Sequence, residues 1–150
     1  MSAAQDYAIK LLGHRARSEL ELRRKLEAKG FSAEEIDQAM ARLKELRYLD
    51  DEALAESRAE SLVQSERKGP RLAVRKLEAA GIEEEKAEAA VESAKGGASE
   101  RELALKALEK RRPPVGPDTP RDERFKAARW LAARGFSEET IRAVLRLDEE

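Results

Sequence analysis

The fold of this chain is decided by a short segment that occurs three times: LEAKGF at residues 26–31, LEAAGI at residues 77–82 and LAARGF at residues 131–136. Each copy ends a helical pattern at a glycine, the residue that most readily adopts the left-handed backbone of a helix C-terminus. The copies lie roughly 50 residues apart, a spacing that is long for a two-helix repeat and fits three helices. The sequence therefore predicts three copies of one three-helix unit.

Composition favours the same fold class. Charged residues make up 41% of the 150 residues and aromatic residues only 4%. Strands favour aromatic and β-branched side chains, whereas Ala, Leu, Glu, Arg and Lys favour helices. Each small unit has few large apolar residues and must share core with its neighbours. We expect an all-α protein whose three tandem three-helix repeats form an elongated, curved array.

Glycines and prolines divide the chain into these repeats. The expected repeats are residues 1–49, 50–96 and 97–150, and a proline-rich loop at residues 112–120 lies inside the third. Capping-box spacing predicts helix starts at three serines, each followed three residues later by glutamate: Ser18, Ser32 and Ser99. Further starts are expected at four other sites: Asp50-Asp51, Gly69-Pro70, Thr119-Pro120 and Ser137.

Helical periodicity also predicts where the first helix ends and which residues the third repeat buries. The first helix is expected to end near Arg17. In the third repeat, the expected apolar positions are Leu105, Leu108, Phe125, Ala128, Leu131, Ile141, Val144 and Leu145.

The residues that most enzymes need are scarce. There is no cysteine and one histidine, which excludes disulfides and thiolate zinc sites, and no phosphate-binding loop or nucleophile motif is present. We interpret His14 as a packed residue that complements a helix dipole, and the acidic run 50–52 as a helix cap rather than a metal site. Trp130 is interpreted as packing, with an interface or a base-stacking role as the alternative. These patterns predict a non-enzymatic protein without cofactor or metal.

Targeting patterns are missing as well. The sequence shows neither a signal peptide nor a long apolar segment, so we expect a soluble, cytoplasmic protein. The strongly charged terminal helices of the expected array predict a monomer.

Basic residues recur near the second helix of every repeat, although Lys and Arg (30) nearly balance Asp and Glu (31). A recurring cationic group would line one side of an array and could bind phosphates or an acidic protein groove. The alternative is a solvated face neutralised by nearby glutamates. The candidate binding residues are Arg23, Arg24, Lys25, Lys68, Arg71, Arg75, Arg121, Arg124 and Arg129.

Three groups of motifs point to a known family: LLGHRARS at residues 11–18 with the pattern through KGF at 29–31, YLDDE at 48–52 with KGPR at 68–71, and residues 130–141. They resemble, in this order, the opening, the middle signature and the C-terminal helices of the RecX family of bacterial regulators of the RecA recombinase.

The resemblance implies three tandem three-helix repeats and a non-enzymatic protein that binds RecA filaments on single-stranded DNA. It also implies inhibition of RecA ATP hydrolysis, strand exchange and co-protease activity, which limits recombination and the SOS response. Two other interpretations remain. One is a helical nucleic-acid-binding protein that acts without RecA, and the other is a scaffold for a different helical partner.

Overall fold

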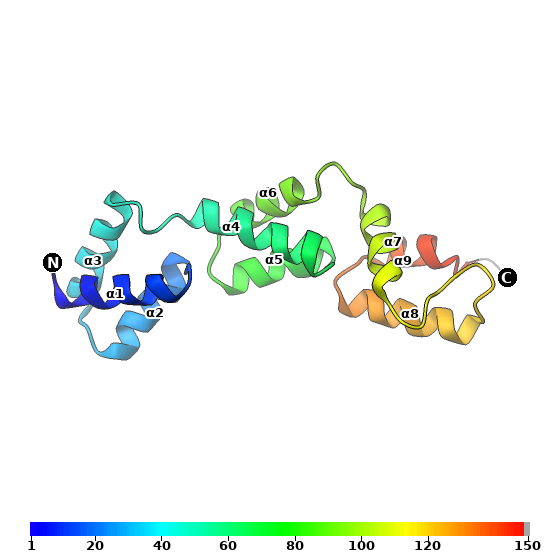
Figure 1. The fold of residues 1–150 in the computed structure, drawn as a ribbon, viewed down its shortest axis with the longest axis horizontal. Coiled ribbons are helices and arrows are strands. Elements are labelled where there is room, and N and C mark those ends of the chain that lie inside the picture. The colour runs from blue at the N-terminus through cyan, green and yellow to red at the C-terminus, as the bar shows by residue number, and fades with distance from the viewer. Residues whose placement is uncertain (149–150) are drawn as a thin grey trace.

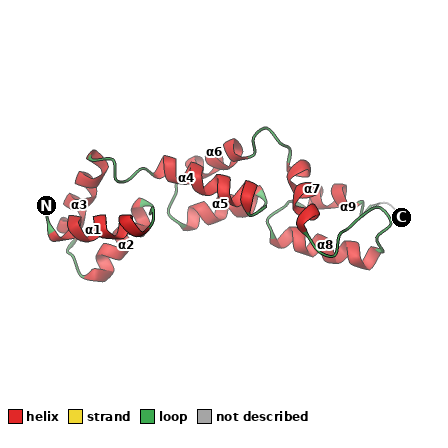
Figure 2. Cartoon of the chain, viewed as in Figure 1, coloured by secondary structure: helices red, strands yellow, loops and turns green. Residues whose placement is uncertain are grey.

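A computed structural model describes residues 1–148, and within them the chain consists of helices and loops without strands (Figure 2). The helices are α1 (Ala3–His14), α2 (Glu19–Lys29), α3 (Ala33–Glu45), α4 (Asp51–Glu60), α5 (Pro70–Ala79), α6 (Glu84–Ala94), α7 (Glu100–Lys110), α8 (Arg121–Ala133) and α9 (Glu138–Leu145). A short π-helix, η1 (Ser61–Ser65), continues α4.

The helices pack as three triplets that follow one another in a row (Figure 1). Helix α1 contacts α2 and α3, α4 contacts α5 and α6, and α9 contacts α7 and α8. The two chain ends lie at opposite ends of the molecule (Figure 1). The all-α fold of three tandem three-helix repeats in an elongated, curved array is thus confirmed. No helix of the described residues is long and apolar enough to cross a bilayer.

Local capping chemistry explains where the helices begin. The Ser18 and Ser32 hydroxyls accept the backbone N–H groups of the glutamates three residues later, and those glutamates return the bond. Asp50, Ser99 and Ser137 cap α4, α7 and α9 with their side chains, as predicted. Pro70 occupies the first turn of α5, where its missing N–H costs little.

The first helix is shorter than predicted. It ends at His14, and Arg15 is already extended, with φ −164° and ψ 158°. The expected end near Arg17 was wrong because Ser18 needs an extended backbone to cap α2, and the chain must leave α1 before it. His14 lies in the last turn of α1, where a cation complements the dipole, but its side chain is exposed rather than packed.

Two apolar residues of the third repeat are also more exposed than predicted. Leu105 is 49% exposed and Phe125 is 39% exposed, while Leu108 and Leu131 are buried and Ala128 is half-buried. Small residues explain the difference at Leu105, since Ala104 and Ala107 let α7 bury a face that turns Leu105 toward solvent. Periodicity counted from the large residues alone selects the wrong face when alanines carry the packing.

Two separate clusters of buried apolar side chains hold the array together. One runs from Ala8 to Leu49 and belongs to the first repeat alone. The other extends from Ala55 to Leu145 through the second and third repeats. The second and third repeats therefore share a continuous core, and the first repeat is attached to it from outside. The expectation that each repeat shares core with its neighbours is thus wrong for the first repeat, whose buried residues form a cluster of their own.

Candidate partner-binding surface

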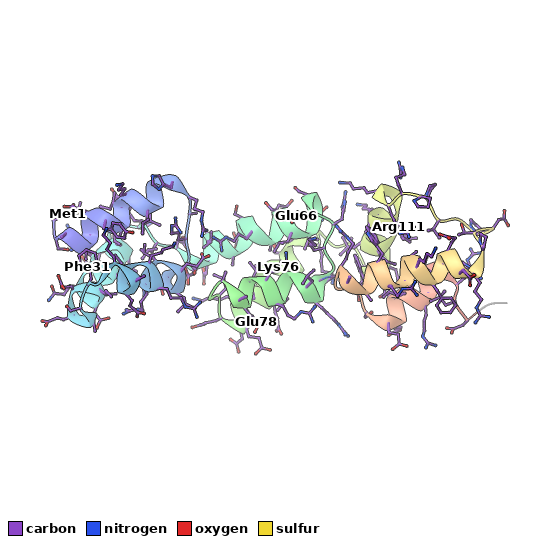
Figure 3. The ribbon with its side chains drawn as sticks, turned by 90° about the horizontal axis from the view of Figure 1, so that it is seen from below. Met1, Phe31, Glu66, Lys76, Glu78 and Arg111 are labelled. Carbon is purple, nitrogen blue, oxygen red and sulfur yellow. The ribbon has the colours of Figure 1, made fainter. Side chains whose placement is uncertain are left out.

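The second helices of the three triplets, α2, α5 and α8, lie along one side of the molecule (Figure 1) and form a row in the view from below (Figure 3). They are arranged head to tail. The N-terminus of α2 meets the C-terminus of α5, and the N-terminus of α5 meets the C-terminus of α8. We call these two meeting points the first and the second joint.

Polar contacts dominate the first joint. The Ser18 hydroxyl donates to the carbonyl of Ala80, and the backbone N–H of Glu19 donates to the Asp51 carboxylate at 3.0 Å. Gly81, with φ +97°, lies against Leu20 so closely that a Cβ atom would overlap that side chain. Only glycine fits there, both for its backbone and for its neighbour.

An ion pair adds to the first joint. The Arg58 guanidinium donates to the carbonyl of Ala16 at 3.2 Å and contacts the Glu21 carboxylate at 3.1 Å. Burial alone would raise the pKa of Glu21, but its hydrogen bond from the Ser18 backbone and the Arg58 guanidinium lower it overall. Burial raises the pKa of Asp51. The joint thus favours the charged form of Glu21 and disfavours the charged form of Asp51.

The second joint is built from backbone and guanidinium contacts. The N–H of Gly69 donates to the carbonyl of Arg134. The Arg134 guanidinium donates to the carbonyls of Arg67, at 3.1 Å, and Glu66, and its Cζ atom lies 4.7 Å from the centre of the Trp130 ring. Trp130 is half-buried, as its interpretation as a packing residue predicts, and it supports the arginine that links the repeats.

Five of the nine candidate cations are exposed on the row and form no ion pair with residues that the structure describes. Two lie on α2, two on α5 and one on α8: Arg24, Lys25, Arg71, Arg75 and Arg129. Lys76 of α5 is exposed in the same way and extends the set. These side chains can reach a partner without breaking a salt bridge.

The other four candidates have different surroundings. Arg23 pairs with Asp37 at 2.9 Å, and Arg124 donates to the carbonyls of Leu145 and Arg146, at 3.2 and 2.9 Å, at the end of α9. Arg121 lies over the Phe125 ring, with 5.3 Å from its Cζ atom to the ring centre. Lys68 is half-buried just before α5.

Neither joint was identified from the sequence. The recurring glycines are the signal that could have revealed the joints, but they were used only to find helix ends and the repeat. At Gly81 and Gly135, the glycine also forms the surface that the first turn of another second helix contacts. A groove of about 580 Å³ lies between α8 and α9, and its lining includes Phe125 and Arg129. The exposed cation of α8 therefore lies beside an apolar surface.

Family comparisons divide the chain into the same three triplets. Residues 4–43 match the first three-helix domain of RecX, residues 50–91 the second and residues 99–145 the third. The chain is 35% identical to the regulatory protein RecX of Chlorobaculum tepidum over 97% of its own length and 88% of that protein's. It is also 35% identical to the regulatory protein RecX of Thermus thermophilus, over 90% of this chain and 84% of that one.

Solved structures share the architecture. The crystal structure of RecX from Lactobacillus salivarius superposes with a TM-score of 0.76 over 97% of this chain and 94% of that one, at 23% identity. A likeness at this level of identity concerns the fold, so the surface of the row has to be interpreted from its own residues.

Proposed function

Since this chain belongs to the RecX family of regulatory proteins, we propose that it is a non-enzymatic regulator that acts in the cytoplasm on the RecA recombinase. It binds RecA filaments on single-stranded DNA and inhibits their ATP hydrolysis, strand exchange and co-protease activity. In this way it limits recombination and the SOS response.

The observation that carries this proposal is the distribution of exposed cations, unpaired within the described residues, over all three second helices: Arg24 on α2, Arg71 on α5 and Arg129 on α8. A filament presents the same surface on every subunit, so an elongated array can engage several subunits at once. Each contact can be weak, because linked sites raise the effective concentration of the next contact. The cations also steer the approach to an acidic or phosphate-lined groove.

The test is a titration of this protein into the DNA-dependent ATPase reaction of the RecA from the same organism. A row variant carries Arg24→Glu, Arg71→Glu and Arg129→Glu, one reversal on each second helix. A control variant carries three reversals at exposed cations outside the row: Lys10→Glu, Arg101→Glu and Lys106→Glu.

The wild type and the control variant should inhibit at similar concentrations, whereas the row variant should need about 10-fold more protein, since charged interface contacts contribute on the order of a few kcal/mol together. Both variants should keep their helices, which circular dichroism checks. Equal inhibition by the row variant would reject the row as the contact surface, and no inhibition by the wild type would reject the proposed function.

Binding of nucleic acid without RecA is the second candidate, and the same exposed guanidinium groups favour it. It predicts a gel shift of single-stranded DNA in the absence of RecA that weakens steeply as salt rises. Negligible binding at moderate salt would remove this candidate and leave the filament as the binding partner.

A further inference from the structure

The row α2–α5–α8 ends at a third copy of the joint surface, and no described residue covers it. Gly30 has the position and the backbone of the two joint glycines, with φ +101° against +97° at Gly81 and +94° at Gly135. A Cβ atom would overlap Leu20 at Gly81 and Leu72 at Gly135, but at Gly30 it would meet no atom of the described residues within 4 Å.

The residue after each glycine shows the same contrast. Ile82 and Phe136 are 3% and 5% exposed. Phe31, their counterpart, is only half-buried and packs against Tyr7 with the ring centres 6.2 Å apart. The end of α2 near Phe31 (Figure 3) is therefore a copy, left uncovered by the described part of the chain, of a surface that is covered twice elsewhere.

The two covered copies show what fits this surface. In each, the occupant is the first turn of a helix with a small N-cap residue, Ser18 or Gly69. The N-cap donates to the carbonyl just before the glycine, from the Ser18 hydroxyl to Ala80 and from the Gly69 N–H to Arg134. A leucine of the first turn then lies on the glycine. The carbonyl of Lys29 is the corresponding acceptor at the free copy.

A cation completes the likeness. At the second joint Arg134 lies over Trp130 and donates to two carbonyls of the segment that leads into the occupant helix. Lys29 has the same position in the first repeat, and its Nζ atom lies 5.2 Å from the centre of the Tyr7 ring. The Lys29 side chain is exposed, and its ammonium group has three hydrogen-bond donors. It can therefore donate to backbone carbonyls of an incoming segment, as Arg134 does at the second joint.

We propose that the Gly30 end of α2 is a docking site for a helix N-terminus of a partner protein. The fitting helix has Ser or Gly at its N-cap and Leu in its first turn, with backbone carbonyls before the cap for Lys29. This site uses none of the six cations Arg24, Lys25, Arg71, Arg75, Lys76 and Arg129, and it does not depend on how they act.

A second copy of this chain is a poor occupant. If copies stacked along the row, the first turn of α8 would have to enter the site, because it is the one start of a second helix that is not already at a joint. Its N-cap is Pro120, which has neither an N–H nor a hydroxyl to donate. Head-to-tail stacking would otherwise continue into an open filament.

The probe is a helix-stapled peptide with the sequence of residues 66–79, which contains the first turn that occupies the second joint. It is titrated into the ¹⁵N-labelled full chain. We expect the amide signals of Lys29, Gly30 and Phe31 to shift. A matched peptide in which the residue equivalent to Leu72 is glutamate should leave them in place.

Two variants of the full chain localise the effect. Gly30→Asn fills the site with a side chain on a residue that tolerates the left-handed backbone, and it should weaken peptide binding at least 10-fold. Gly97→Asn is the control, since Gly97 also has positive φ, at +82°, and open space around it. It should bind the peptide as the wild type does.

Three outcomes would overturn the proposal: no shift at Gly30 up to millimolar peptide, equal shifts with the glutamate peptide, or unchanged binding by Gly30→Asn. Self-association in analytical ultracentrifugation that Gly30→Asn abolishes would also overturn it, because the occupant would then be a second copy.

Discussion

Glu21 shows how much one side chain contributes at the first joint. Its carboxylate accepts the Ser18 N–H at 2.9 Å, contacts Arg58 of the second repeat at 3.1 Å and lies 3.6 Å from Arg15. The first of these bonds closes a capping box within α2, and the second links two repeats. Its negative charge matters mainly for the second, because a glutamine can also close a capping box.

Replacing Glu21 by glutamine should therefore weaken the chain only where the charge is needed. The folded protein lowers the pKa of Glu21, so its stabilising contribution is present above the ordinary glutamate pKa and is lost as the pH falls through the folded value. Because the pair is partly exposed, Glu21→Gln should cost less than about 1 kcal/mol at pH 7.

Urea unfolding at neutral and acidic pH measures this difference. The gap between wild type and Glu21→Gln should shrink toward zero on acidification, and the control Glu27→Gln, an exposed glutamate of the same helix, should show no gap at either pH. A gap that is equally large at both pH values would show that the charge is not the cause.

At the scale of a helix, the starts could be predicted from the sequence and the joints could not. A capping box is a local pattern of four residues, so Ser18, Ser32 and Ser99 were sufficient to locate α2, α3 and α7. The same Ser18 hydroxyl also bonds to Ala80, 62 residues away, and nothing in the local pattern indicates that bond. The exposure of Phe125 was missed for a related reason, because neighbouring helices decide which face of α8 is buried.

Comparing Ser18 with Ser32 measures how much the Ser18 hydrogen bond across the first joint contributes to the free energy of unfolding. Both close capping boxes, but only Ser18 is fully buried and donates across the first joint. Ser32→Ala should cost about 1 kcal/mol through loss of the cap. Ser18→Ala should cost roughly 1 kcal/mol more, because the Ala80 carbonyl is left without its partner.

Chemical denaturation of the two variants at neutral pH gives both values. Equal losses would mean that the hydroxyl contributes only as a cap and that the first joint does not need it.

For the candidate site, the sequence indicated which helices carry the recurring cations but not which cations are available. Arg23 and Arg24 are neighbours in sequence, yet the first pairs with Asp37 and the second is exposed and unpaired in the described chain. The Arg124 side chain donates hydrogen bonds to the last carbonyls of α9 instead of facing solvent. Such choices depend on which side chain the next helix brings close, and this is decided by packing between elements.

Across the whole molecule, the two joints differ in kind. The second and third repeats share one apolar core, whereas the first repeat has its own and is attached by hydrogen bonds and the Arg58–Glu21 pair. In repeat arrays, stability is close to a sum of repeat and interface terms. The first repeat should therefore open while the other two stay folded.

Native-state hydrogen exchange tests this expectation. Amides of Leu26 and Leu43 in the first core should exchange through an opening that costs at least roughly 1 kcal/mol less than the opening that exposes Leu77 and Leu103.

Arg58→Met removes the guanidinium that joins the repeats and should lower the opening free energy of the first repeat alone. Lys126→Met, which removes an ion pair inside α8, is the control and should leave the first repeat unchanged. A single opening free energy for all buried amides would show instead that the three repeats unfold as one unit, and that the polar joint couples them as tightly as the shared core does.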